Sequence, residues 1–330
     1  MNHSTFKSFT FGIGLFFTLP LVYGNSSSPS SSDGTLYINK SKTHKVAPVK
    51  YGFHYEEIGM MGEGALHAEL IRNRSFEEAT PPAGLSVKNG LYENVPAPRV
   101  KEKKVFQADP LIGWTTYPLS YTPVFISRTD ENPMSGENKY SMLVNVTEDI
   151  ANHPDALILN RGYYGMNLKT DTSYRLSLFL KNRNYSAPLR VFLVDEWGQR
   201  VSNVIEVNVG NRDWTKYTGE LKPEKNVRRG MFAIQPMSKG QFQIDVVSLF
   251  PSDTWNDGKS VFRKDIVQNL KEFSPSFIRF PGGCIVHGVN EETMYHWKKT
   301  LGPIENRPGQ WSKWAPYYRT DGIGYHEFYE

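Results

Sequence analysis

The 330-residue sequence contains only one cysteine, Cys284, so it cannot form an internal disulfide bond. A chain without disulfides must be stabilised by core packing, and this one is long enough for two domains. The motifs of common nucleophile and nucleotide sites are also missing, because no G-x-S-x-G, P-loop or dinucleotide fingerprint occurs. His287, His296 and His326 are too scattered to match a metal-binding motif. We therefore expect no cofactor and no metal ion.

Strong charge and long apolar runs are scarce as well. The net charge of +4 is small for this length, and the basic segment Lys101–Lys104 is short. The sequence has no basic stripe suited to nucleic acid, so we expect no nucleic-acid partner. One apolar run, from Phe9 to Leu21, stands out, but it is too short and too interrupted by Gly and Pro to span a membrane. We expect no membrane span.

The N-terminal residues instead have the pattern of an export signal. His3 and Lys7 precede the apolar run, and the small residue Gly24 follows it at a suitable cleavage point. We predict a signal peptide at residues 1–24 and a flexible Ser-rich tether at residues 25–45. The protein is then expected to be exported, whether secreted, periplasmic or held at the cell surface.

Residues 46–104 begin like an α/β domain. A strand-like segment ends with two adjacent carboxylates, Glu56 and Glu57, which in a strand point to opposite faces. One of them can face a site while the other faces solvent or an Arg; the alternative is that both are surface charges. The next segment, Gly62–Glu78, carries apolar residues at helical spacing.

Residues 105–251 have a different pattern, in which short segments alternate apolar and polar residues between turn signals such as Gly210-Asn211. Many short strands at regular intervals, with no helical pattern between them, predict an antiparallel β-sandwich or jelly roll. The predicted strands are Tyr140–Val146, Tyr174–Leu180, Leu189–Val194, Ile205–Val209, Trp214–Leu221, Met231–Ile234 and Phe242–Phe250.

Residues 252–330 return to α/β patterns. Asp257–Phe273 predicts an amphipathic helix, and Phe277–Cys284 predicts a short buried strand followed by a tight Gly-rich turn. An α/β barrel presents residues at its strand C-termini in this way. Taken alone, the octapeptide fits an ordinary turn and a small core cysteine equally well. The predicted fold class is α/β plus all-β, with the sandwich at 105–251 inserted into, or packed beside, an α/β domain.

Several blocks of the sequence, taken in this order, resemble the α-L-arabinofuranosidases of glycoside hydrolase family 51. The blocks are Tyr55–Ile58, Ala68–Glu78, Phe277–Cys284, Tyr295–Ile304 and Asp321–Gly324. Their common order makes the likeness more specific than any single block. Two further segments, Asn160–Asn167 and Asp213–Tyr217, resemble more weakly the family 4/9 type of carbohydrate-binding module found inside some members.

The resemblance implies a fold and a chemistry. The fold is the N-terminal part of a (β/α)8 TIM barrel, formed by residues 46–104 and 252–330, with a galactose-binding-like jelly roll inserted at 105–251. The chemistry is a retaining hydrolysis, in which one Glu protonates the leaving oxygen and a second Glu forms a glycosyl-enzyme.

The resemblance also implies site residues. Glu56 matches a pocket glutamate that hydrogen-bonds arabinofuranose hydroxyls, and Cys284 matches the sugar-contacting residue after Pro-Gly-Gly. Arg279 is expected to brace that site, and Trp297 to line the pocket. The family's two catalytic Glu residues have no counterpart before Glu330, so both are expected beyond the chain end and no catalytic residue is assigned. Roughly 140 barrel-type residues are present, against ~250 for a full barrel.

These patterns leave two functions open. The first is an exported enzyme that removes terminal non-reducing α-L-arabinofuranosyl residues from arabinan or arabinoxylan side chains, of which this chain is expected to be an inactive fragment. The alternative is a non-catalytic carbohydrate-binding module protein, in which the sandwich works alone. Neither function predicts an oligomeric state.

Overall fold

A computed structural model of the chain describes residues 38, 39, 41, 51–79, 87–88, 91–93, 105–107, 109–288, 291, 294–307, 309–312 and 317–330. The chain divides into two compact units, residues 1–50 and 51–330, and all the described helices and strands belong to the second. The predicted signal peptide lies outside the described residues, as does the predicted tether apart from Ile38, Asn39 and Ser41. Among the residues described, no helix is long and apolar enough to cross a membrane.

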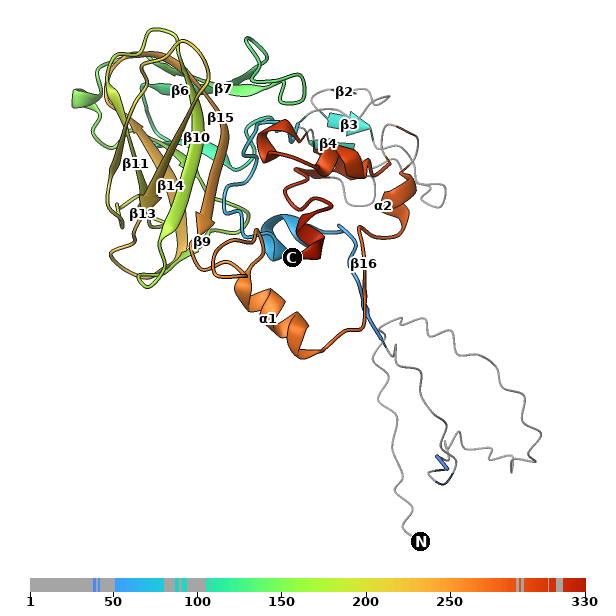
Figure 1. The fold of residues 1–330 in the computed structure, drawn as a ribbon. Helices are drawn as coiled ribbons and strands as arrows, with labels where there is room; N and C mark the ends of the chain where they lie inside the picture. The colour runs from blue at the N-terminus through green and yellow to red at the C-terminus, as the bar shows by residue number, and fades with distance from the viewer. Residues whose placement is uncertain are drawn as a thin grey trace. The chain divides into compact units, whose positions relative to one another are not determined.

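Two antiparallel sheets form the largest part of the second unit (Figure 1). Their strands are β5 (Trp114–Tyr117), β6 (Val124–Thr129), β7 (Ser141–Val146), β8 (Leu157–Asn160), β9 (Met166–Leu168), β10 (Tyr174–Asn182), β11 (Pro188–Val194), β12 (Ile205–Asn208), β13 (Thr215–Leu221), β14 (Val227–Pro236) and β15 (Gly240–Pro251). The five-stranded sheet has the order β13-β10-β15-β7-β6. The six-stranded sheet has the order β12-β11-β14-β8-β5, with β9 beside β14. Residues 114–251 together form the two-sheet region.

The two sheets share one hydrophobic core. In β10 nearly every second side chain is buried, as expected when one face of a strand packs on another sheet. Leu178 and Ile244 of the five-stranded sheet belong to the same fully buried cluster as Ile158 and Phe232 of the six-stranded sheet. All seven strands predicted from alternation are present, and β5, β6, β8 and β9 add to them.

A second, smaller apolar cluster lies on the outer face of the six-stranded sheet. Met231 and Ala233 of β14 point away from the shared core and pack with Leu159 of β8 and Phe192 of β11. The middle of β14 is therefore buried on both faces, which explains its continuous apolar run at Met231–Ile234.

The remaining elements are short. They are β1 (Phe53–His54), the π-helical turn η1 (Gly62–Leu66), β2 (Val87–Lys88), β3 (Leu91–Glu93), β4 (Val105–Gln107), the 3-10 turn η2 (Ile150–Asn152), helices α1 (Lys264–Glu272) and α2 (Cys284–His287), β16 (Ile278–Arg279), the 3-10 turns η3 (Trp297–Thr300), η4 (Ile304–Asn306) and η5 (Glu327–Tyr329), and β17 (Gln310–Ser312) with β18 (Tyr317–Arg319). β1 pairs in parallel with β16, β2-β3-β4 form a small antiparallel sheet, and β17 and β18 form an antiparallel pair.

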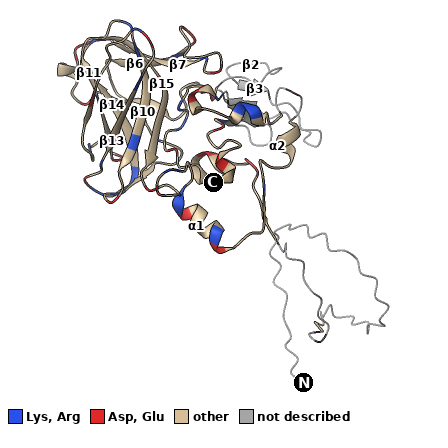
Figure 2. Cartoon of the chain, in the orientation of Figure 1, with Lys and Arg blue, Asp and Glu red and all other residues tan. Residues whose placement is uncertain are grey.

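The helix predicted at Asp257–Phe273 is confirmed only in its second half, as α1. Asn256, Asp257 and Gly258 have positive φ angles, so the helix cannot begin before them. Charges of both signs lie along α1 (Figure 2), and none of its residues is buried. The apolar side chains of this amphipathic helix are therefore not fully covered by any of the described residues.

Two further predictions are wrong. The helical spacing of Gly62–Glu78 gives only the single turn η1, because Asn73 and Phe76 adopt positive φ and the chain continues irregularly. The strand predicted as buried within Phe277–Cys284 is β16, whose two residues are exposed. Within the described part of the chain, β16 pairs with β1 alone, so most of its surface is not covered.

Candidate functional site

The candidate site begins where the parallel strands β1 and β16 end. Phe53 lies opposite Ile278, and His54 lies opposite Arg279. The carboxyl ends of parallel strands meet at one edge of a sheet, where α/β folds place their ligands. Glu56 is the second residue after β1, and its side chain lies next to the Gly-rich turn that follows β16.

The turn after β16 approaches Glu56 closely because it contains glycine. Gly282 has a φ of +144°, and a Cβ atom there would lie 2.4 Å from Cγ of Glu56. That distance is far below van der Waals contact, and the φ angle is one that L-residues rarely adopt. Gly282 therefore allows the turn to pack against the Glu56 side chain.

The Glu56 carboxylate is held from two sides. One oxygen, Oε1, accepts a hydrogen bond of 3.3 Å from the backbone N–H of Ile285, and Oε2 lies 3.8 Å from Nε2 of His54. A Cβ atom at Gly283 would be 3.4 Å from Oε2 of Glu56 and 3.6 Å from Nη2 of Arg279. The carboxylate and the guanidinium therefore both border Gly283, and the Glu56 side chain remains 17% exposed.

The other two predicted site residues differ in their placement. Cys284 is exposed as a free thiol at the start of α2, directly after the turn, as the sequence predicted. Trp297 is 44% exposed and packs on Tyr325 with ring centroids 5.1 Å apart. Tyr325 in turn contacts the ring of Phe280, which directly follows β16. Among the described residues, no hydrogen bond or ring contact joins Trp297 to the other three predicted site residues, whose sugar-binding roles stay predictions.

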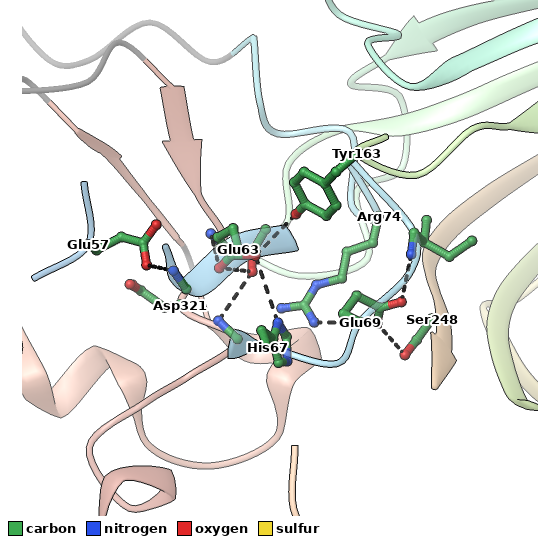
Figure 3. Close-up of polar contacts among 12 residues, drawn as sticks. Glu57, Glu63, His67, Glu69, Arg74, Tyr163, Ser248 and Asp321 are labelled. Carbon is green, nitrogen blue, oxygen red and sulfur yellow. Dashed lines mark hydrogen bonds and ion pairs between the residues drawn. The ribbon is translucent and has the colours of Figure 1, made fainter. Parts of the chain in front are cut away.

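A buried layer of carboxylates underlies this edge, and Figure 3 shows Glu63 at its centre. One oxygen of Glu63 accepts hydrogen bonds from the backbone N–H and the hydroxyl of Thr320, at 3.0 and 2.7 Å. The other oxygen accepts from the Tyr163 hydroxyl at 3.3 Å and lies 3.8 Å from Nδ1 of His67. Glu63 thus connects η1 to the residues after β18 and to the two-sheet region.

Glu57 belongs to the same layer and points away from Glu56. Its Oε2 accepts hydrogen bonds of 2.7 Å from both the Tyr55 hydroxyl and the backbone N–H of Gly62. A small cavity of about 20 Å³ adjoins it, lined by Tyr55, Glu57, Glu63, Pro281, Tyr295, Arg319, Asp321, Ile323 and Phe328. This volume is enough for about one water molecule. The predicted divergence of the two adjacent carboxylates is confirmed.

Another buried carboxylate, Glu69, connects the segment after η1 to β15. Its Oε1 accepts hydrogen bonds from the backbone N–H of Ile71 at 3.0 Å and of Leu249 at 2.8 Å, and its Oε2 accepts one from the Ser248 hydroxyl at 2.6 Å. Arg74 is also buried, with Nη1 4.0 Å from Oε2 of Glu69 (Figure 3). Burial raises the pKa of Glu69, while the Arg74 charge and these hydrogen bonds act against that rise.

The pKa values of two other buried carboxyl groups are shifted in opposite directions. Burial alone would raise the pKa of Glu63, but the hydrogen bonds and charges of its neighbours, with His67 first, lower it to about 2. Burial raises the pKa of Glu78 to about 7, because the single Arg72 side chain 3.5 Å away compensates only in part. Within the described residues, no group of His, Cys, Asp and Glu side chains could hold a metal ion.

Sequence reasoning did not single out Glu63, Glu69 or Asp321 as buried. Carboxylates are rarely buried, and nothing in the local pattern marks these three. The density of polar residues at 72–78, which include the buried Arg74, was the available signal.

Comparison with known proteins supplies the family context for this geometry. A family model described as "Alpha-L-arabinofuranosidase 1 domain" matches residues 269–330, which include β16, the turn and Trp297. Alpha-L-arabinofuranosidase 1 of Arabidopsis thaliana is 28% identical over 285 residues, covering 85% of this chain and 38% of the relative. The extracellular exo-alpha-L-arabinofuranosidase of Streptomyces chartreusis is 27% identical, covering 84% of this chain and 30% of the relative.

A solved structure agrees with these relatives. The arabinose-bound MgGH51 α-L-arabinofuranosidase superimposes with a TM-score of 0.69 and 25% identity, covering 88% of this chain and 43% of that chain. This chain is a relative of the GH51 α-L-arabinofuranosidases. The GH51-like chain spans less than half the length of each of these three proteins. The activity and substrates of a whole protein that contains it are therefore proposals.

Proposed function

We propose that this GH51-like chain carries the arabinofuranose-binding part of an exported α-L-arabinofuranosidase. One observation carries the proposal: the parallel pairing of β1 and β16 brings Glu56 against the Gly-rich turn that presents Cys284. A carboxylate that accepts hydrogen bonds can orient a sugar by its hydroxyl groups. In this account Glu56 binds hydroxyls, Cys284 contacts the ring, Arg279 braces the carboxylate, and Trp297 forms part of the pocket wall.

The proposal includes the architecture around the site. β1 and β16 are taken as strands of a (β/α)8 barrel, to which residues 46–104 and 252–330 contribute. The two-sheet region is taken as the central part of an inserted carbohydrate-binding-module-like sandwich, at 105–251. The parallel pairing of β1 with β16 supports this view, because all strands of such a barrel run parallel.

We further propose that this chain binds the sugar without cleaving it. A retaining glycosidase needs two carboxyl groups about 5 Å apart, one on each side of the reacting bond. Glu57 is the carboxylate next to Glu56, and it is occupied by hydrogen bonds from Tyr55 and Gly62. The acid/base and the nucleophile are therefore not assigned to Glu56 and Glu57. Arabinan or arabinoxylan side chains are the proposed substrates.

Export is part of the same proposal. The relative from Streptomyces chartreusis is named as extracellular. A cleaved or anchored leader at residues 1–24 would place this chain in the same compartment, where plant polysaccharides are met.

The test uses the chain as it stands with 4-nitrophenyl α-L-arabinofuranoside. Saturation-transfer NMR measures binding, and absorbance measures released 4-nitrophenol. We expect binding without release, and no binding of the matched 4-nitrophenyl β-D-xylopyranoside. Appreciable release would refute the proposal that this chain binds the sugar without cleaving it. Equal binding of both glycosides would refute the arabinofuranose site.

A further inference from the structure

A hollow of about 570 Å³ lies on the outer face of the six-stranded sheet. Leu159 and Met231 form part of its floor, and both belong to the apolar cluster that faces away from the shared core. Its rim carries polar and aromatic groups, including Arg161, Tyr164 and Arg229. This site lies on strands β5, β8 and β14 and includes none of the residues of the arabinofuranose site proposed above.

The hollow continues into two neighbouring ones. Tyr164, Glu196 and Arg229 also line a second hollow of about 560 Å³, which includes Trp197. Tyr163 and Tyr164 also line a third, of about 370 Å³. Small-molecule sites typically measure about 300–1,000 Å³. Three adjoining hollows of these sizes suit an extended ligand better than a single small molecule.

Two aromatic side chains stand out at this face, because Tyr164 is 82% exposed and Trp197 is 73% exposed. Tyr164 sits on a tight turn closed by a 3.0 Å hydrogen bond from Gly165 N–H to the Arg161 carbonyl. Gly165 has a φ of +89°, and a Cβ atom there would lie 3.1 Å from Cα of Arg229. The turn therefore packs directly on β14, which holds the backbone at Tyr164 in place.

Trp197 is held by a comparable turn between β11 and residue 200. Asp195 Oδ1 accepts hydrogen bonds from the backbone N–H of Trp197 at 3.1 Å and of Gln199 at 2.9 Å. Asp195 Oδ2 accepts from Nζ of Lys225 at 3.0 Å. Both exposed rings are thus presented by turns whose backbones are pinned, so a ligand that stacks on them orders little additional chain.

Charged groups around the rings are available to a ligand. The guanidinium groups of Arg161 and Arg229 make no hydrogen bond or ion pair with any residue that the structure describes. Each has five N–H donors. Glu196 adds an acceptor on the same rim. Donors, an acceptor and flat apolar rings together match a chain rich in hydroxyl groups, whereas the Glu196 carboxylate disfavours a phosphate-rich one.

We propose that this face binds a neutral glycan chain several sugars long. The sugar rings stack their C–H faces on Tyr164 and Trp197, and Arg161, Arg229 and Glu196 hydrogen-bond the hydroxyl groups. The assignment of that glycan to an arabinose-bearing plant polysaccharide rests on the proposed function; the binding of a glycan chain does not. The face would hold the polymer while the arabinofuranose site engages a side branch.

The test is affinity electrophoresis of the full chain in native gels. The gels contain soluble arabinoxylan, debranched linear arabinan or dextran, and retardation gives the binding strength. We expect retardation by arabinoxylan, by arabinan or by both, which identifies the backbone recognised, and none by dextran. Equal mobility in all gels, or equal retardation by dextran, would overturn the proposal.

Variants locate the binding on this face. Trp197→Ala and Tyr164→Ala should each weaken binding about tenfold, while Tyr164→Phe keeps most of it because the ring remains. Phe125→Ala is the matched control, since Phe125 is 56% exposed on β6 of the other sheet and should leave binding unchanged. Equal losses for Trp197→Ala and Phe125→Ala would contradict the proposal.

Two controls keep this result separate from the proposed function. All four substitutions are at exposed side chains, so the unfolding temperature should stay at the wild-type value and confirm an intact fold. Trp197→Ala should also keep wild-type binding of 4-nitrophenyl α-L-arabinofuranoside. If no gel retards the chain while it still binds the arabinofuranoside, only the proposed glycan-binding face is refuted and the arabinofuranose site is not.

Discussion

At the residue scale, the candidate site depends on two neighbouring carboxylates with different tasks. Glu56 borders Gly282 and Gly283 and stays partly exposed, whereas Glu57 is buried and receives the N–H of Gly62. The strand pattern predicted this divergence, because adjacent residues of an extended chain point to opposite faces. The close approach of Gly282 to Glu56 was not predictable in detail, since it depends on the pairing of two segments more than 200 residues apart.

The first residue-scale prediction concerns Gly282→Ala. The added methyl group would clash with Cγ of Glu56, and the φ of +144° is strained for alanine, so we expect a loss of about 2 kcal/mol in the free energy of unfolding. Arabinofuranoside binding should fall with it. Denaturant unfolding and saturation-transfer NMR measure the two effects. Gly210→Ala is the control, because nothing lies within 4 Å of its Cβ position; equal effects of the two substitutions would contradict the account.

The second residue-scale prediction concerns Glu78, whose pKa is raised from 4.5 to about 7. Between these values the folded chain binds more protons than the unfolded chain, so stability falls as pH rises from 4.5 to 7 and then levels off. Glu78→Gln removes this titration. The variant should therefore gain up to about 3 kcal/mol over the wild type across this window. Urea unfolding between pH 4.5 and 8 checks it, and parallel curves for the two proteins would show the prediction wrong.

At the element scale, long alternating patterns were reliable and short segments were not. The seven strands predicted between Tyr140 and Phe250 are present because each buries one face in a shared core. The helical spacing after Gly62 was misleading, because positive φ angles at Asn73 and Phe76 turn the chain instead. In that segment, the side chains of Glu69 and Asn73 accept hydrogen bonds from backbone N–H groups that a helix would pair with backbone carbonyls. The spacing of apolar residues along the sequence does not reveal such side-chain hydrogen bonds.

The element-scale prediction concerns the junction between the segment after η1 and β15. Glu69→Ala removes the acceptor for the N–H groups of Ile71 and Leu249 and deprives the buried Arg74 of its ion-pair partner. Removing one partner of a buried ion pair typically costs about 3–5 kcal/mol. Denaturant unfolding should show a loss of this size.

A surface ion pair provides the control for that experiment. Glu206 lies 3.2 Å from Arg190, and both side chains are roughly half exposed, so Glu206→Ala should change the stability little. Equal losses for Glu69→Ala and Glu206→Ala would mean that Glu69 does not anchor the junction.

At the scale of the whole molecule, the GH51-like chain combines a well-covered two-sheet region with exposed α/β elements. β16 and α1 have no buried residue, although each carries apolar side chains. The sequence blocks identified the relatives correctly, since family likeness depends on a shared order along the chain and not on burial. The glycan face was not predictable, because its rings come from turns at residues 161–165 and 195–199, which become neighbours only in the folded sheet.

The most direct test of the central claim compares Glu56→Gln with Glu272→Gln, a matched change at an exposed glutamate of α1. The ligand is methyl α-L-arabinofuranoside, and saturation-transfer NMR titration gives its dissociation constant. The account predicts about tenfold weaker binding for Glu56→Gln, because a charged acceptor is lost, and no change for Glu272→Gln. Wild-type affinity in Glu56→Gln would contradict the claim that Glu56 and the turn after β16 form an arabinofuranose site.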